Sequence, residues 1–307
     1  MSYSTFTVRV DGGDLTVGRW AAQDDDAPVV LALHGITAHH LAWPHVAEAL
    51  DLHVIAPDLR GRGRSRDVAG AGLVTHADDA ATVARSVVGA DGQVIVVGHS
   101  MGAFVAMVLA DRYPELVAGV VLVDGGFPFA EQEKETTVGA LEAIKARLEA
   151  RLPSEEAYVD LFRSHPAFAG DADAVVEEYA RYDVVEQDGE FHAGAVLESV
   201  LADQRDVLGS APFFGALESL RALPAGRGGR NSRHWVFLRA PRGFVDDPPG
   251  LYAASTAAEL AERYKAVEFR EVDDVNHYTI VMSEHGAAAV ARAVRDVSPR
   301  RWSAASG

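Results

Sequence analysis

A serine between two glycines is the residue of this sequence best placed to act as a nucleophile. Gly98, Ser100 and Gly102 form a Gly-x-Ser-x-Gly pattern between a β-branched run at 94–97 and small or apolar residues at 103–110. This order predicts a strand, a sharp turn and a helix, with the serine hydroxyl at the tip of the turn. The helix N-terminus beside it favours negative charge, so an oxyanion could be stabilised there. This context favours a catalytic serine over a Gly-Ser turn that only connects two buried elements.

A serine hydroxyl needs a base to remove its proton, and the base needs a carboxylate that fixes its tautomer. Among twelve histidines, His277 stands in a loop after the last predicted strand, from which its side chain can reach Ser100. Two strand-end positions offer the carboxylate: Asp124 after the strand that follows Ser100, and Asp246 after the next strand. Both give the chain order nucleophile, acid and histidine that is expected when the serine stands in a turn between a strand and a helix. The residues themselves leave the choice of acid open.

Other histidines need a separate interpretation. We expect His34 and His99 to be structural, since both stand next to the predicted catalytic turns. His39, His40 and His45 could suggest a metal cluster, but no carboxylate stands among them, so a scattered set without metal is favoured. Contact of His39 or His40 with substrate stays open.

The elements that would position these residues alternate along the chain. Two alternating runs at 5–10 and 14–20 flank a turn and predict a β-hairpin. Continuous apolar runs then alternate with helix-like segments, at 29–33, 53–57, 94–97, 119–123, 234–238 and 266–272. Such alternation predicts an α/β fold with a mostly parallel sheet that has helices on both faces, and parallel sheets carry their sites at the strand C-termini.

The alternation stops between residues 127 and 230. Only helix-like segments follow there, at 131–152, 154–164, 171–182, 193–208 and 213–223. We therefore predict a core formed by 1–126 and 231–307, with an all-helical cap inserted at 127–230. A return loop at 227–231 is predicted to be mobile, and the tail at 300–307 to be frayed.

Taken together, these motifs resemble those of the α/β-hydrolase superfamily. The resemblance covers the chain outside the predicted cap and rests on His34-Gly35, Asp58-x-Arg60-Gly61-x-Gly63-x-Ser65, Gly98-His99-Ser100-Met101-Gly102 and Asn276-His277. It implies a Ser-His-Asp triad and an oxyanion hole made by the backbone N–H groups of Ile36 and Met101.

The acid departs from the common pattern of that superfamily. Many members end the penultimate strand with Gly-x-x-Asp, whereas Gly243 stands here where that aspartate would be. Certain haloalkane dehalogenases and the fungal zearalenone lactonases take the acid from the preceding strand end, where Asp124 stands. The resemblance therefore favours Asp124, with Asp246 as the alternative.

By the same resemblance, the chain is expected to be a carboxylesterase-like or lactonase-like serine hydrolase that needs no cofactor. Aromatic residues spread through the predicted cap, which suggests an apolar small-molecule substrate. The alternatives are a carbon–carbon bond hydrolase, a zearalenone-type lactonase, or a catalytically weak ligand-binding protein with the same fold.

Composition limits the partners. The 307 residues carry 28 basic and 45 acidic side chains, a net charge of −17, which argues against nucleic acid or an anionic membrane as a partner. The sequence contains no cysteine, which excludes disulfides and thiolate chemistry. Neither a signal peptide nor an apolar run long enough to span a bilayer is evident, so we expect a cytoplasmic protein, either monomer or homodimer.

Overall fold

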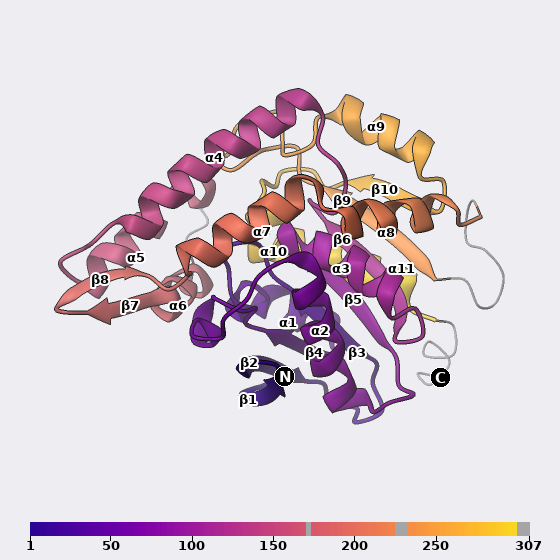
Figure 1. Ribbon diagram of the computed structural model, residues 1–307, viewed down its shortest axis with the longest axis horizontal. Coiled ribbons are helices and arrows are strands. Elements are labelled where there is room, and N and C mark those ends of the chain that lie inside the picture. Colours follow the sequence, from indigo (N-terminus) through magenta and orange to yellow (C-terminus); the bar gives the residue numbers. More distant parts are fainter. Residues whose placement is uncertain (170–172, 225–232, 300–307) are drawn as a thin grey trace.

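The computed structural model describes residues 1–169, 173–224 and 233–299 (Figure 1). The predicted return loop at 227–231 and the tail at 300–307 lie outside these residues.

Eight strands form one sheet in the order β1-β2-β4-β3-β5-β6-β9-β10. Their bounds are β1 Ser2–Val10, β2 Gly13–Ala21, β3 Val29–Leu33, β4 His53–Pro57, β5 Val94–His99, β6 Val117–Val123, β9 His234–Arg239 and β10 Val267–Glu271. Neighbouring strands from β4 to β10 are parallel, whereas β1 and β2 form an antiparallel hairpin and β2 pairs antiparallel with β4. The predicted α/β fold, its mostly parallel sheet and its first hairpin are confirmed.

Helices cover both faces of the sheet, which explains the continuous apolar runs. Val96 in β5 packs with α2 (Leu73–Val88) and α3 (Met101–Arg112), while its neighbour Val97 packs with α1 (Pro44–Leu50) and α11 (Glu284–Val297) on the other face. Side chains alternate between the two faces of a strand, so a strand with two covered faces must be apolar at every position. The remaining helices outside 127–224 are η1 (His40–Ala42), η2 (Gly63–Ser65), α9 (Ala254–Arg263) and α10 (Thr279–Met282).

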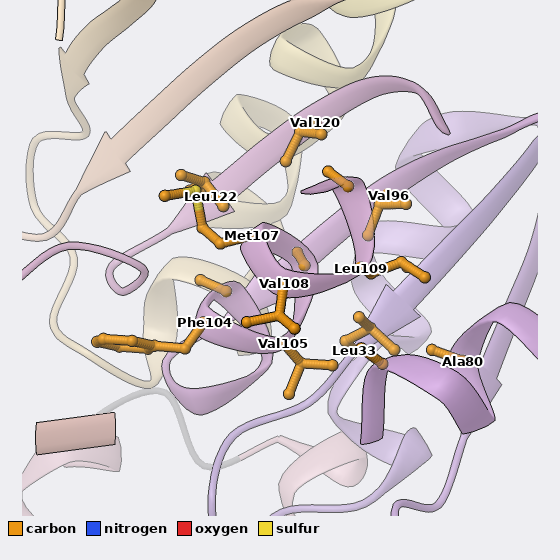
Figure 2. Packing of buried hydrophobic residues seen from close by; sticks show 14 of the residues in the cluster. Leu33, Ala80, Val96, Phe104, Val105, Met107, Val108, Leu109, Val120 and Leu122 are labelled. Atoms are coloured by element: carbon orange, nitrogen blue, oxygen red, sulfur yellow. The ribbon is translucent and has the colours of Figure 1, made fainter. Parts of the chain in front are cut away.

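The helix that follows Ser100 is held firmly in the core. Every residue from 101 to 110 is buried. Figure 2 shows Phe104, Val105 and Val108 of α3 packed in a cluster that also includes Leu33 of β3 and Leu122 of β6. Because close-packed side chains resist displacement, α3 provides a rigid support for the serine at its N-terminus.

We call residues 127–224 the insert. It contains α4 (Glu131–Glu149), α5 (Glu155–Arg163), η3 (Pro166–Phe168), α6 (Ala174–Asp183), α7 (Leu197–Gly209) and α8 (Ala211–Arg221). In Figure 1, α4 and α7 cross the upper part of the view, on the side away from the β1–β2 hairpin, and the two helices contact each other. A cluster of buried apolar residues that includes Leu148 of α4, Val159 of α5 and Val200 of α7 forms a small core within the insert.

The prediction that this region is all-helical is wrong. Two short strands, β7 (Val184–Gln187) and β8 (Glu190–Ala193), form an antiparallel hairpin. Their two-residue turn is Asp188-Gly189, with φ of 54° and 81°. An Asp-Gly pair favours this turn because both of its positions need a positive φ, and that signal stands in the sequence.

No helix in the described ranges is long and apolar enough to cross a membrane.

Candidate active site

Ser100 stands in a strained turn between β5 and α3. Its backbone has a φ of 53° and a ψ of −123°, a conformation that residues other than glycine rarely adopt. A Cβ atom on Gly98 would lie 2.2 Å from the carbonyl oxygen of Gly102, and one on Gly102 would lie 2.0 Å from the carbonyl oxygen of Leu33. Both flanking positions therefore require glycine, and the tight turn leaves the serine side chain partly accessible.

The structure brings Ser100, His277 and Asp124 together. The Nε2 atom of His277 lies 3.1 Å from Ser100 Oγ, and its Nδ1 atom lies 2.7 Å from Asp124 Oδ2. Asp124 follows β6 and is fully buried, and His277 lies in the loop after β10. A proton on Nδ1 donates to the carboxylate, so Nε2 is free to accept the serine proton.

The second oxygen of the Asp124 carboxylate also has a partner. The backbone N–H of Ala240, just after β9, donates to Asp124 Oδ1 over 3.1 Å. The aspartate is thus held between the ends of two neighbouring strands and aimed at His277. This support fixes the direction of the carboxylate without any further side chain.

Asp246, the alternative acid, lies elsewhere. Its Oδ1 accepts hydrogen bonds from Arg242 Nε at 2.7 Å and from Asn276 Nδ2 at 2.9 Å. Within the described residues it makes no hydrogen bond to His277. The geometry therefore places Asp124, and not Asp246, next to the histidine.

The loop that carries Ile36 lies against the serine. A Cβ atom on Gly35 would be 3.3 Å from Ser100 Cβ. The Gly35 carbonyl accepts hydrogen bonds from His34 Nδ1 at 2.8 Å and from the Ala38 N–H at 3.1 Å. Because a trans peptide points its carbonyl and its N–H in opposite directions, these bonds also fix the N–H of Ile36. The N–H groups of Ile36 and Met101 have no partner among the hydrogen bonds of the described chain.

The other histidines near the site brace the surrounding loops. Nε2 of His34 accepts the Leu59 N–H at 2.9 Å, and Nε2 of His99 donates to the His277 carbonyl at 2.7 Å. His39 stacks on Tyr179 with ring centroids 4.0 Å apart. In the part of the chain that the structure describes, no group of three or more histidine and acidic side chains could hold a metal ion.

Asn276 has a role at this site that the sequence analysis did not assign. Its Nδ2 donates to the Ala167 carbonyl at 2.8 Å and to Asp246, and its Oδ1 accepts the N–H groups of Tyr278 and Thr279, each at 2.9 Å. All of its bonding groups are therefore used to hold the loop that carries His277. Its position directly before that histidine was the only signal available in the sequence.

The burial of His34 and His39 leads us to expect that the protein loses stability in acid. Burial lowers the pKa of His34 and of His39 to about 3. In each ring one nitrogen already accepts a backbone N–H, from Leu59 and Leu41 respectively, so it cannot take a proton. The unfolded chain, with a histidine pKa near 6.5, binds these protons as the pH falls below 6.5. The free energy of unfolding should therefore drop by roughly 2 kcal/mol per histidine between pH 7 and pH 5.

Urea unfolding at the two pH values measures this effect. The variant His39→Gln should show a smaller difference in the free energy of unfolding between pH 7 and pH 5 than the wild type, because it removes one of the buried histidines whose pKa is lowered. His285→Gln, at an exposed position, is the control and should leave the difference unchanged. If the free energy of unfolding of His39→Gln changed between pH 7 and pH 5 as much as that of the wild type, His39 would not contribute to the loss of stability in acid.

Comparison with known proteins identifies a family and several relatives of this chain. A family model described as "Alpha/beta hydrolase family" matches residues 29–293. A 2-(acetamidomethylene)succinate hydrolase from Mesorhizobium japonicum is 35% identical over 145 residues, which are 46% of this chain and 48% of the relative. An esterase from Mycobacterium tuberculosis is 32% identical over 158 residues, 50% of this chain and 51% of the relative. The chain thus matches about half the length of these curated relatives.

Solved structures resemble the chain over nearly its full length. A crystal structure of E-2-(acetamidomethylene)succinate hydrolase has a TM-score of 0.76 at 22% identity and covers 96% of this chain and 99% of its own. The thioesterase domain from the curacin biosynthetic pathway has a TM-score of 0.71 at 19% identity, and covers 96% and 100%. At these identities the likeness establishes the fold alone.

Proposed function

Because the chain belongs to the alpha/beta hydrolase family, we propose that it is a serine hydrolase that cleaves an ester or lactone bond of an apolar small molecule. One observation carries the proposal. A continuous series of hydrogen-bonding distances links Ser100 Oγ to His277 and His277 to the Asp124 carboxylate. This arrangement converts a weakly nucleophilic hydroxyl into one that can attack a carbonyl carbon.

In the first half of the reaction, Ser100 Oγ attacks the carbonyl carbon while His277 Nε2 takes the hydroxyl proton. The carbonyl π electrons move onto the oxygen, where the N–H groups of Ile36 and Met101 stabilise the negative charge. Asp124 stabilises the imidazolium that forms. Collapse of the tetrahedral intermediate breaks the bond to the leaving alcohol oxygen, which receives the proton from His277. The product of this half is an acyl group on Ser100.

In the second half, water replaces the alcohol. His277 Nε2 removes a proton from the water as its oxygen attacks the acyl carbon, and the same proton passes to Ser100 Oγ when the acyl bond breaks. The carboxylic acid leaves and the resting enzyme returns. For a lactone, the alcohol and the acid stay joined in one product molecule.

The insert is proposed to act as a lid over this site, with 1–126 and 231–307 as the core and 127–230 as the lid. Several of its contacts support this role: Tyr182 donates to Asp58 at 2.7 Å, and Arg147 Nη2 donates to Thr37 Oγ1 at 2.9 Å, beside Ile36. Phe168 of the insert contacts the ring of Tyr278, which follows the catalytic histidine, at 5.6 Å between centroids. Aromatic side chains close to the reacting groups support an apolar substrate.

The position of the acid supports the lactonase alternative. Asp124 follows β6, the strand end from which zearalenone lactonases are expected to take their acid, and it lies against His277. The machinery would be unchanged, because a lactone is an internal ester. A panel of lactones beside p-nitrophenyl esters of increasing chain length would identify the preferred class.

Labelling with a fluorophosphonate probe tests the proposal. We expect one probe molecule to attach to Ser100 in the folded protein, detected by mass spectrometry of the intact chain and of its peptides, and attachment to stop after unfolding in urea. A folded protein that takes no label would contradict the serine hydrolase. A protein that takes the label but hydrolyses no member of the ester and lactone panel would instead support a catalytically weak ligand-binding protein.

A further inference from the structure

Arg62 is a fully buried arginine beneath the loop that carries Ile36. Its Nε donates to the Ile36 carbonyl at 2.8 Å and its Nη1 donates to the Arg60 carbonyl at 2.8 Å. The peptide before the Ile36 Cα atom is held by His34 through the Gly35 carbonyl. Arg62 holds the peptide after it, so the peptides on both sides of the Ile36 Cα atom are held, the first by the loop itself and the second by Arg62.

The countercharge of Arg62 comes from the insert. Asp203, on α7, is fully buried, and its Oδ2 lies 2.6 Å from Arg62 Nη1 and 3.0 Å from His76 Nε2. Its Oδ1 accepts the N–H of Gly72 at 2.5 Å, just before α2. Asp203 therefore joins three parts of the molecule: the loop of Arg62, the start of α2 and the helix α7.

Electrostatic attraction holds Arg62, Asp203 and His76 together. Burial by itself raises the pKa of Asp203, but the charges and hydrogen bonds of His76 and Arg62 outweigh it and lower the pKa to about 2. The carboxylate is thus ionised beside the guanidinium. Removing the Asp203 charge would leave the Arg62 guanidinium buried without a countercharge, which strongly favours movement of the loop or of α7.

A role in positioning explains this pair better than a role in stability. Within the described residues, Nη2 of Arg62 and Nδ1 of His76 are buried without a hydrogen-bond partner. A buried ion pair with unsatisfied N–H groups is often no more stabilising than apolar side chains of the same size. What apolar side chains could not supply is the hydrogen bond from Arg62 Nε to the Ile36 carbonyl.

We propose that Arg62 and Asp203 are positioning residues that hold the Ile36 N–H toward Ser100 only while α7 is seated on the core. This inference rests on the proposed function, since it assigns the Ile36 N–H to the oxyanion. According to this inference, the Ile36 N–H stabilises the oxyanion only when the insert is closed. An open insert would withdraw Asp203, release Arg62 and loosen the Ile36–Thr37 peptide, which directly follows the donor.

Asp206 is a matched control on the same helix. It lies one turn after Asp203, and its Oδ2 accepts the N–H of Leu73 at 3.0 Å. It therefore binds α7 to the start of α2 as Asp203 does, but within the described residues it has no contact with Arg62. A difference between the two aspartates would report on the link to the Ile36 loop and not on the seating of α7 in general.

The experiment compares Asp203→Asn, Asp206→Asn and the double variant Arg62→Met/Asp203→Leu with the wild type. Asp203→Asn should lower kcat for a p-nitrophenyl ester roughly 10- to 100-fold with little change in KM, because a small misplacement affects the transition state most. Binding of a trifluoromethyl ketone, which forms a tetrahedral adduct on the serine, should weaken by a similar factor. Asp206→Asn should keep the kcat of the wild type.

The double variant separates positioning from folding. It removes both charges, so its Tm should stay near that of the wild type, while its kcat stays as low as that of Asp203→Asn. Recovery of the wild-type kcat in the double variant, or an equal loss in Asp206→Asn, would overturn the inference. A wild type that neither takes the fluorophosphonate nor hydrolyses an ester would overturn the proposed function and the inference with it, whereas an active wild type and an equally active Asp203→Asn would overturn the inference alone.

Discussion

Replacing Ser100 by alanine is expected to lower kcat for ester hydrolysis roughly 10⁵- to 10⁶-fold while the protein stays folded. The Ser100 Oγ atom is the one that would carry the acyl group. No other serine or threonine hydroxyl of the described chain is within hydrogen-bonding distance of His277 Nε2. Alanine still leaves the turn and the helix intact, because the strain of the turn is in the backbone. Initial rates with a short-chain p-nitrophenyl ester measure the loss, and circular dichroism verifies the fold.

Two comparisons make this prediction specific. The double variant Ser100→Ala/His277→Ala should be no slower than Ser100→Ala alone, since residues that act as one unit lose their effect together. Ser86→Ala removes a serine on α2 whose hydroxyl donates to the Val83 carbonyl, and it should keep full activity. If Ser100→Ala kept substantial activity, the nucleophile would have to be another group.

The second large effect is expected for Asp124→Asn, with a loss in kcat of roughly 10³- to 10⁴-fold. An asparagine can present its NH₂ group to His277 Nδ1, which leaves the proton on Nε2, where it prevents uptake of the serine proton. It also cannot stabilise the imidazolium. The Ala240 N–H can still donate to the amide oxygen, so the fold should be preserved.

Asp246→Asn is the matched comparison, because the same change is made at the other candidate acid. Asp246 is partly exposed and bonded to Arg242 and Asn276, so its replacement should lower kcat less than tenfold. Rates measured at several pH values with the same ester compare the two variants. A large loss in Asp246→Asn together with a nearly active Asp124→Asn would reverse the assignment of the acid.

Much of the core could be predicted from local sequence. Strands β3, β5 and β6 are short continuous apolar runs because both of their faces are covered by helices, and burial on two faces leaves a direct trace in residue type. The requirement for glycine at Gly98 is equally local, since a Cβ atom there would meet the backbone of Gly102, whereas Gly102 is required by the carbonyl of Leu33 on the neighbouring strand β3. These features explain why the fold class was predicted correctly.

The insert was predicted less well. Its helices were predicted but its two strands were missed, because β7 and β8 have only four residues each. So short a run carries little periodicity, and Asp188-Gly189 is compatible both with a break between helices and with a hairpin turn. Packing within the small core of the insert decides between the two, and this packing depends on residues distant in the sequence.

The sequence by itself determined the kinds of group that the site contains: a serine in a glycine turn, a histidine in a loop after the last strand, and two aspartates at strand ends. Only the tertiary structure decided which aspartate lies on His277, that Asp246 instead holds Asn276, and that Asp203 of α7 pairs with Arg62 beneath the Ile36 loop. The reason is physical. Backbone turns and buried strands are set by nearest neighbours along the chain, whereas the partner of a charged side chain is set by which strand ends and helices the packed core brings within a few ångströms.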